Sequence, residues 1–303
     1  MRLEVQPRRN ILTQLIEGLL LERGFVVRSF TVQLTPPTHH FVESYPDLVY
    51  TQFEGDHLLS GGQQLHFDFL KPVTKTPTPL VVFVKGGGFR NVHRARYLPA
   101  LVPLAQRGIA IASVEYRTSN LVKFPQPVED VREALRYIRA HAIEFNIDPT
   151  NVGMWGNSAG ATIVTIAGAS ADEGAEPIRA VASWYGIHDP LRSSKFRASG
   201  SPMRATLGPP DDEGGHWYKP SDCIGPQSPP MFLVHGTDDQ VVPMEQSVAL
   251  AETLDEVGVP YELMLIEGGR HDFAQTSTCT DALQHTLDFL YNHLIKSDDS
   301  HNS

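Results

Sequence analysis

The chain has few cysteines, no excess of basic charge and no long uninterrupted apolar run. Its 303 residues include two cysteines, Cys223 and Cys279, which are too few for a disulfide framework and do not form a metal-type pair. We interpret both as structural thiols. Because 25 basic side chains stand against 35 acidic ones, giving a net charge of −10, a nucleic-acid partner is not expected.

The absence of long apolar runs bears on membranes and targeting. No segment reaches the ~18 consecutive apolar residues that a membrane span requires. Residues 11–25 follow Arg8 and Arg9, as in a secretory signal, but Gln14 and Glu17 interrupt the stretch and no small-residue cleavage site follows. We interpret it as an amphipathic helix and expect a cytoplasmic protein without a membrane span. The sequence does not define the oligomeric state, and a homo-oligomer is one of the alternatives.

From about residue 64 onward, short β-rich runs alternate with helical patterns. This alternation predicts an α/β fold with a mostly parallel central sheet and helices on both faces. The clearest predicted helix covers residues 127–145. A second predicted helix begins after Pro243, and a third covers residues 282–295. The predicted strands are Leu65–Phe69, Leu80–Val84, Ile109–Val114, Val152–Trp155, Ala180–Trp184, Met231–Val234 and Tyr261–Ile266.

Two regions do not follow the alternation. Residues 1–60, which include a strand-like run at 25–34, are expected to form a cap or to extend the edge of the sheet. Residues 187–228 are rich in Gly, Pro, Ser and charge, and long irregular segments inside a domain are usually functional. We expect them to form a small cap on a main domain of residues 61–296, followed by a disordered tail at 297–303.

A five-residue motif between a predicted strand and a predicted helix carries the chemistry. Gly156-Asn157-Ser158-Ala159-Gly160 matches the nucleophile elbow G-x-S-x-G, in which the serine occupies a strained strand-to-helix turn. The residues two before and two after the serine must be small because they approach each other closely. A glycine-rich turn without chemistry would also fit these five letters alone, but the strand and the helix lie where the elbow needs them.

A serine nucleophile needs a base and an orienting carboxylate, in the chain order Ser, Asp or Glu, His. His271 lies in a glycine-containing loop after the last predicted strand and has the right order and place. Asp238 and Asp239 follow the preceding predicted strand, and the residues alone do not decide between them. His235, at the end of that strand, is expected to form a turn.

The stretch VFVKGGGFR, residues 82–90, places three glycines after an apolar strand. An acyl-transfer site needs backbone N–H groups for the oxyanion, and glycines let such groups approach the substrate oxygen. We predict that this loop supplies oxyanion-hole donors together with the amide of Ala159. The alternative is a tight turn without a functional role.

These motifs in order resemble α/β-hydrolase carboxylesterases of the hormone-sensitive-lipase and prolyl-oligopeptidase-like kind, and among them bacterial feruloyl and acetyl-xylan esterases. The similarity runs from about Leu65 to Ile295 and rests on VVFVKGGGF, WGNSAGAT, PPMFLVHGTDDQVVP and EGGRHDF. It implies the α/β-hydrolase fold, Asp239 as the acid, and Gly87 and Gly88 as oxyanion donors. The family usually begins the oxyanion loop with histidine, where this chain has Lys85.

Three roles are open for Lys85: bracing the loop, reaching solvent with its charged end, or holding a cation near the substrate. Phe89, Trp184 and Tyr185 are further candidates for substrate binding. Trp217 and Tyr218 complete the aromatic residues that could line an aromatic pocket, although core or cap packing also explains most of them.

The predicted function is a serine carboxylesterase for short-chain acyl or hydroxycinnamoyl (feruloyl, acetyl) esters, acting through Ser158, His271 and Asp239 and an acyl-enzyme. Its substrate is a small-molecule or carbohydrate-linked ester, and no cofactor or metal is implied. The alternatives are an arylformamidase or other amidase, since the same triad cleaves amides, and a non-catalytic hydrolase-like binding protein.

Overall fold

The structure is a computed structural model that describes residues 39–53, 63–90, 93–169, 176–198, 201, 206–208, 218–272 and 278–295. The helix expected at 11–25 and the strand-like run at 25–34 lie outside these residues, as does the tail at 297–303. None of the described helices is long and apolar enough to cross a bilayer.

An eight-stranded sheet in the order β1-β2-β4-β3-β5-β6-β7-β8 forms the centre of the described fold. The pairs β1–β2 and β2–β4 are antiparallel, and every pair from β4 to β8 is parallel. All residues of β3 and β4 are buried, as expected of strands covered on both faces. The strands are β1 (Val42–Phe53), β2 (Gln63–Pro72), β3 (Thr78–Val84), β4 (Ala110–Val114), β5 (Ile147–Asn157), β6 (Ala180–Trp184), β7 (Met231–Gly236) and β8 (Tyr261–Ile266).

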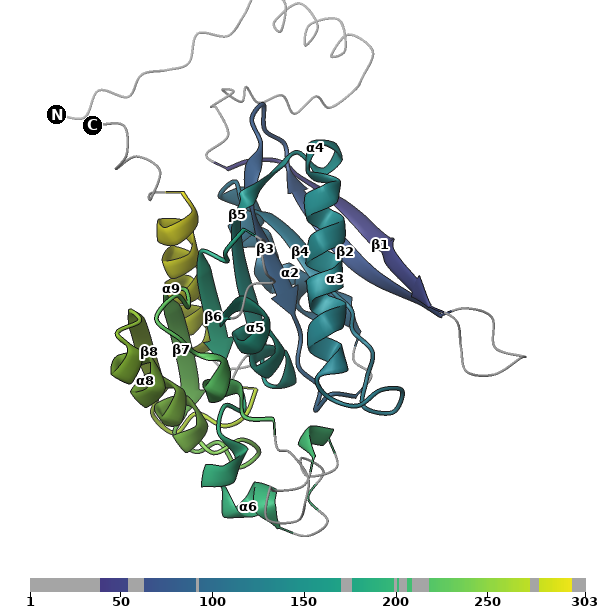
Figure 1. The fold of residues 1–303 in the computed structure, drawn as a ribbon. Coiled ribbons are helices and arrows are strands. Elements are labelled where there is room, and N and C mark those ends of the chain that lie inside the picture. The colour runs from purple at the N-terminus through teal and green to yellow at the C-terminus, as the bar shows by residue number, and fades with distance from the viewer. Residues whose placement is uncertain are drawn as a thin grey trace, which may run out of the picture. The chain divides into compact units, whose positions relative to one another are not determined.

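Helices cover both faces of this sheet (Figure 1). One apolar cluster joins one face of the sheet to α3 (Gln126–Ala140), α5 (Ala159–Ala169) and α8 (Glu245–Val257). A second cluster joins the opposite face to α2 (Leu98–Gln106) and α9 (Thr278–Leu294). Alternate residues of β3 enter the two clusters, as the period of two in a strand requires. The predicted α/β architecture is confirmed.

Each of the seven predicted strands overlaps an observed one. No strand was predicted at residues 42–53, although residues 1–60 were expected to form a cap or to extend the edge of the sheet, and β1 is an edge strand. Its sequence contains Pro46, and the pairing with β2 shifts register between Tyr45 and Leu48, where Asp47 has a φ of 63°. An edge strand tolerates a proline and a bulge of this kind, and most of β1 is exposed. These features hide the strand from a search for continuous β-rich runs.

The predicted helix at 127–145 is two helices, because α3 ends at Ala140 and α4 (Ala142–Phe145) follows after His141. The left-handed residue Asn146, with a φ of 54°, ends α4. In the 187–228 region, the described residues include three short elements, η2 (Pro190–Arg192), α6 (Ser194–Arg197) and η4 (Pro220–Cys223).

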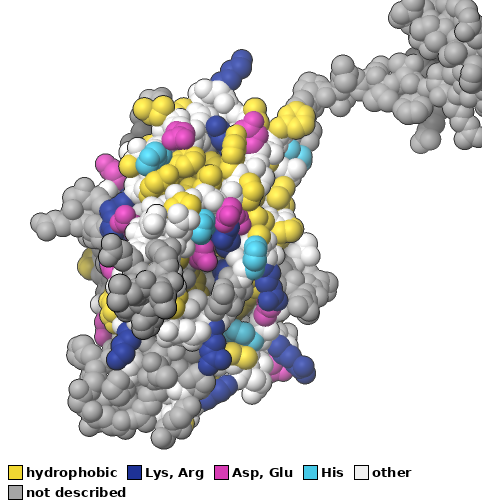
Figure 2. Space-filling view, turned by 90° about the vertical axis from the view of Figure 1, so that its right-hand side faces the viewer, with side chains coloured by type: hydrophobic (Ala, Val, Ile, Leu, Met, Phe, Trp, Pro, Cys, Tyr) yellow, Lys and Arg dark blue, Asp and Glu magenta, His cyan; other side chains and the backbone are white. Residues whose placement is uncertain are grey.

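Figure 2 shows one face of the molecule in space-filling form. Among the side chains described on this face, acidic, basic and histidine groups are interspersed with hydrophobic ones.

Candidate active site

Ser158 occupies the turn between β5 and α5. Its φ is 51°, a left-handed value that a non-glycine residue adopts only under constraint. A Cβ added at Gly156 would lie 2.5 Å from the Gly160 carbonyl oxygen, and one added at Gly160 would lie 1.9 Å from the Val84 oxygen. The two glycines of the motif therefore allow β5, α5 and β3 to meet around the serine.

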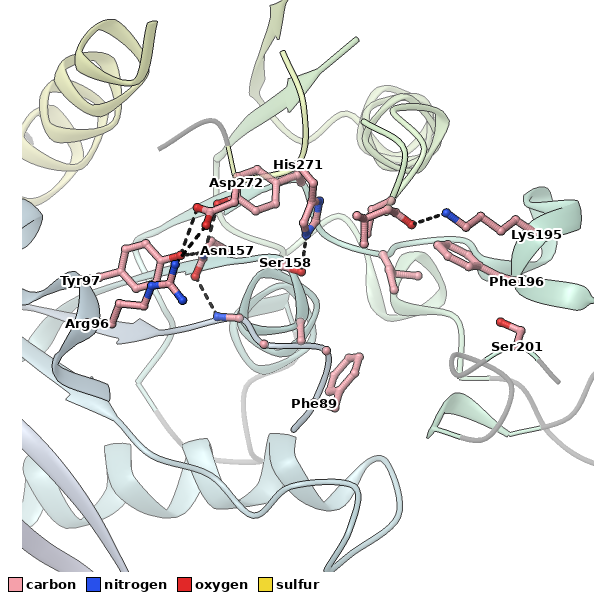
Figure 3. A pocket seen from close by; sticks show the side chains of 18 residues that line it. Phe89, Arg96, Tyr97, Asn157, Ser158, Lys195, Phe196, Ser201, His271 and Asp272 are labelled. Atoms are coloured by element: carbon pink, nitrogen blue, oxygen red, sulfur yellow. Dashed lines mark hydrogen bonds and ion pairs between the residues drawn. The ribbon is translucent and has the colours of Figure 1, made fainter. Parts of the chain in front are cut away.

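Ser158, His271 and Asp239 form a continuous hydrogen-bonded chain (Figure 3 shows the serine and the histidine). The Ser158 Oγ lies 3.0 Å from the His271 Nε2, and the His271 Nδ1 lies 2.6 Å from the Asp239 Oδ2. If the Nδ1 donates to the carboxylate, the Nε2 is left to accept from the serine hydroxyl. This arrangement can remove a proton from Ser158.

Asp239 is buried, whereas the adjacent Asp238 is exposed. The Oδ1 of Asp239 accepts hydrogen bonds from the backbone N–H groups of Val241 and Val242 at 2.8 and 2.9 Å. Burial by itself would raise the pKa of Asp239, but hydrogen bonds from His235 and His271, with the Val242 amide, hold this pKa well below its usual range. The carboxylate therefore stays ionised beside the histidine.

His235 was expected in a turn, and that prediction is wrong. It is the fifth residue of β7 and is fully buried, with its Nδ1 2.7 Å from the Ser247 Oγ. Its Nε2 faces two oxygens, the Val242 carbonyl at 2.9 Å and the Asp239 Oδ2 at 3.4 Å, so this nitrogen carries the proton. His235 thus supports the carboxylate from behind. A histidine inside a fully apolar strand was the sequence signal for a buried polar role.

The glycine loop follows β3 and passes close to Ser158. The amide of Gly86 donates to the Asn157 Oδ1 at 2.8 Å, so it is already engaged. Gly87 and Gly88 have φ values of 142° and 62°, and their amides have no partner among the described residues. Ala159, as the first residue of α5, has no intrahelical acceptor for its amide. Three donors are thus available near the serine.

Asn157 connects this loop to the loop that carries His271. Its Nδ2 donates to the hydroxyls of Tyr97 and Tyr185 at 3.0 and 3.1 Å. The Tyr97 hydroxyl in turn lies 3.3 Å from the carboxylate of Asp272, the residue after the histidine (Figure 3). Asn157, Tyr97 and Asp272 were not predicted as site residues, since only the folded chain brings them together.

A pocket of about 540 Å³ opens over Ser158 and His271. The glycine loop and Ala159 line it, and so do Phe89 and Tyr185 from the predicted substrate-binding set. Ile187 and Phe196 close another side from the 187–228 region (Figure 3 labels Phe196). Most of these walls are aliphatic or aromatic, which suits an uncharged acyl or alcohol group.

The other predicted aromatic residues lie elsewhere. Trp184 lines a neighbouring cavity of about 250 Å³, and its Nε1 donates to the Thr286 Oγ1 at 2.9 Å. Tyr218 packs edge-on against Phe124, with ring centroids 4.8 Å apart. Trp217 lies outside the described residues.

Lys85 does not line the pocket over Ser158. Its side chain faces a third cavity, of about 270 Å³, and the residue is only 3% exposed. Burial lowers the pKa of Lys85 to about 8, an effect that the charge of Glu115 opposes and that of Arg96 assists. Of the three roles open for this lysine, neither a charged end in solvent nor a cation beside the substrate matches this position.

We predict that Lys85→Met stabilises the protein at pH 7. A lysine whose pKa falls from 10.5 to about 8 on folding destabilises the fold by roughly 3 kcal/mol below pH 8. This cost disappears as the pH rises from 8 to 10.5, because the unfolded chain then also loses its proton. Denaturant unfolding from pH 7 to 10 should show a gap between variant and wild type that closes with pH. The matched substitution at the exposed Lys123 should show no such gap.

A metal centre was not expected from the sequence. Within the part of the chain that the structure describes, no group of three or more His, Cys, Asp or Glu side chains is arranged to hold a metal ion.

Comparison with known proteins places this chain in a family. The BD-FAE family model matches residues 68–254, more than half of the chain. Esterase LipQ of Mycobacterium tuberculosis is 26% identical over a region that covers 65% of this chain and 51% of LipQ. The chain spans about half the length of the first curated relatives that it matches.

Solved structures agree on the fold. A truncated carbohydrate esterase from gut microbiota superimposes with a TM-score of 0.70 at 24% identity, covering 85% of this chain and 98% of that one. A bacterial heroin esterase gives a TM-score of 0.68 at 24% identity, covering 93% and 91%. This chain belongs to the BD-FAE family and has the α/β-hydrolase fold.

Proposed function

We propose that this chain is a serine carboxylesterase that hydrolyses short-chain acyl or hydroxycinnamoyl esters through an acyl-enzyme. The observation that carries the proposal is the chain of contacts from Ser158 to His271 at 3.0 Å and from His271 to Asp239 at 2.6 Å. The family relatives support it, since LipQ bears the name of an esterase.

In the first half of the reaction, the Ser158 Oγ attacks the ester carbonyl carbon and its proton passes to the His271 Nε2. The ionised Asp239 stabilises the imidazolium that results. The tetrahedral intermediate then collapses, the bond to the alcohol oxygen breaks, and His271 returns the proton to that oxygen. The acyl group remains on Ser158.

In the second half, a water molecule gives a proton to the His271 Nε2 and attacks the acyl carbon. Collapse of this intermediate returns the proton to the Ser158 oxygen and releases the acid. In both halves the carbonyl oxygen becomes negative, and the free amides of Gly87, Gly88 and Ala159 are its proposed hydrogen-bond donors.

The walls of the pocket support the proposed acyl range. A cavity of about 540 Å³ with Phe89, Tyr185 and Phe196 in its walls suits an acetyl group or a planar hydroxycinnamoyl group better than a long alkyl chain.

A substrate panel tests this function. We expect p-nitrophenyl acetate or butyrate to exceed p-nitrophenyl decanoate in kcat/KM by about tenfold or more, because ordering a long flexible chain in the pocket costs conformational entropy that a short acyl group does not lose. Methyl ferulate and acetylated xylan extend the panel to the hydroxycinnamoyl and carbohydrate-linked classes. Ser158→Ala, assayed in parallel, gives the background for each substrate.

The same panel can refute the proposal. If the enzyme hydrolysed N-formylkynurenine faster than every ester, the chain would be assigned to the amidases. A chain that neither turns over any ester nor reacts with a fluorophosphonate probe would instead be a binding protein on this fold.

A further inference from the structure

The cavity that Lys85 faces lies across the glycine loop from the catalytic pocket. It has a volume of about 270 Å³ and shares no lining residue with the pocket over Ser158. Residues 86–89 line the catalytic pocket, whereas Lys85 and Arg90, which flank them, line the second cavity. One loop therefore separates two distinct spaces.

Two of the four charged side chains in this cavity already have partners. The Arg117 guanidinium binds Asp130 through its Nε, 3.0 Å from the Oδ1, and lies over the ring of Phe53. The Glu115 Oε2 lies 3.4 Å from Arg94 and 3.3 Å from the ring of His66. The carboxylate that lines the cavity is therefore already in contact with Arg94 and His66.

The other two charged side chains, Lys85 and Arg90, are both cations. Among the described residues, neither the Lys85 Nζ nor the Arg90 guanidinium has a hydrogen bond or an ion pair, although the charge of Glu115 acts on Lys85 from a longer distance. The lysine is 3% exposed, and a buried cation without a partner is costly. An anion that entered the cavity would meet two uncommitted positive groups.

The remaining lining narrows the kind of anion. Phe53, Leu65 and Leu121 supply apolar wall, and Thr118 with the two glutamines at 63 and 64 supplies a few neutral polar groups. An inorganic ion would leave the apolar wall in contact with water, whereas a small ligand with one charged end would cover it. The volume suits a molecule of about the size of benzoate.

We propose that this cavity binds a small organic monocarboxylate, with its carboxylate on Lys85 and Arg90 and its apolar body against Phe53, Leu65 and Leu121. This site is independent of the proposed esterase activity. It also gives a reason for a lysine at the start of the glycine loop, since the cation would bind a ligand in the second cavity and not in the pocket over Ser158.

The binding should weaken as the pH rises. The carboxylate needs a protonated Lys85, whose pKa without ligand is about 8. The charged and titratable groups around this lysine are Glu115, Tyr116, Arg90, Arg96 and Arg117. The residues that β1 and β2 contribute to the cavity do not titrate: Phe53, Gln63, Gln64 and Leu65. His66, also on β2, contacts Glu115. Burial places the pKa of Tyr116 far above 10, and arginines stay charged, so Lys85 controls the pH response between 7 and 9.

Isothermal titration with sodium benzoate tests the site, with benzamide as the neutral analogue and inorganic phosphate as the small anion. We expect benzoate to bind at millimolar concentration or tighter, at least tenfold more tightly than either comparison ligand. Lys85→Met should weaken binding at least tenfold, and Arg90→Gln at least threefold. A change from pH 7 to 9 should weaken it by up to about tenfold, the change in protonated lysine.

Lys195→Met is the matched control, because Lys195 lines the catalytic pocket and not this cavity. If benzoate bound as a product analogue over Ser158, Lys195→Met would weaken it and Lys85→Met would not, which would overturn the proposal. Undetectable benzoate binding, or phosphate binding more tightly than benzoate, would also overturn it. Circular dichroism checks that each variant is folded, and the exposed Arg90 keeps the test valid should Lys85→Met fail to fold.

Discussion

Ser158→Ala is expected to lower kcat for the best ester substrate by at least ~10⁴-fold, the scale of loss when a triad nucleophile is removed. The physical reason is that the proposed acyl-enzyme forms on the Ser158 Oγ, which lies 3.0 Å from the His271 Nε2, and the variant lacks this atom. Steady-state assays of purified variant and wild type measure the ratio. KM should change far less than kcat, because one oxygen atom contributes little to the walls of the pocket.

A fluorophosphonate probe provides the control for this experiment. Ser201 also lines the catalytic pocket, but His271 is directed at Ser158 (Figure 3). Ser201→Ala should therefore keep probe labelling, and Ser158→Ala should lose it. Turnover by Ser158→Ala within tenfold of wild type would show that the reaction does not pass through this serine.

Gly160→Ala is expected to destabilise the fold by about 3 kcal/mol or more, a large part of the ~5–15 kcal/mol that stabilises a typical protein. The added methyl group would lie 1.9 Å from the Val84 oxygen and 2.6 Å from the Val84 carbonyl carbon. Both are backbone atoms of the central strand β3, which cannot move aside as a side chain could. Thermal unfolding followed by circular dichroism should show a fall of roughly 6–12 °C or more, or the protein should fail to fold.

Gly225→Ala is the matched control for this substitution. A methyl group at Gly225 would meet nothing within 4 Å, and its backbone does not have a left-handed φ. Its unfolding free energy should stay within about 0.5 kcal/mol of wild type. Equal melting temperatures for the two alanine variants would contradict the close approach of α5 to β3.

The elements around the proposed nucleophile could be predicted because their chemistry constrains neighbouring positions. The motif around Ser158 requires a strand before it and a helix after it, and both are present as β5 and α5. The order of serine, acid and histidine then limited the search to two loops, after β7 and after β8. The structure brings His271 from the second of these loops to the serine.

Other features depend on contacts that sequence neighbours do not reveal. Asp238 and Asp239 are adjacent, and only the packing of the loop after β7 decides that the second is buried against two histidines. The sequence also does not reveal the direction of the Lys85 side chain, because this residue follows the last residue of β3 and lies beyond the strand's regular alternation. Its side chain could have faced either side of the loop.

The hydrogen bond from the Gly86 amide to the Asn157 side chain joins positions 71 residues apart. In a library of mutants, this contact should separate substitutions that lower activity in general from substitutions that change substrate preference. Substitutions at Asn157 should reduce activity on all substrates together, because they release the loop that carries the proposed oxyanion donors. Substitutions at Phe89 or Phe196 should instead change the ranking of substrates. Selectivity in this chain is therefore open to laboratory evolution through the pocket walls, provided that the pair of Gly86 and Asn157 is kept constant.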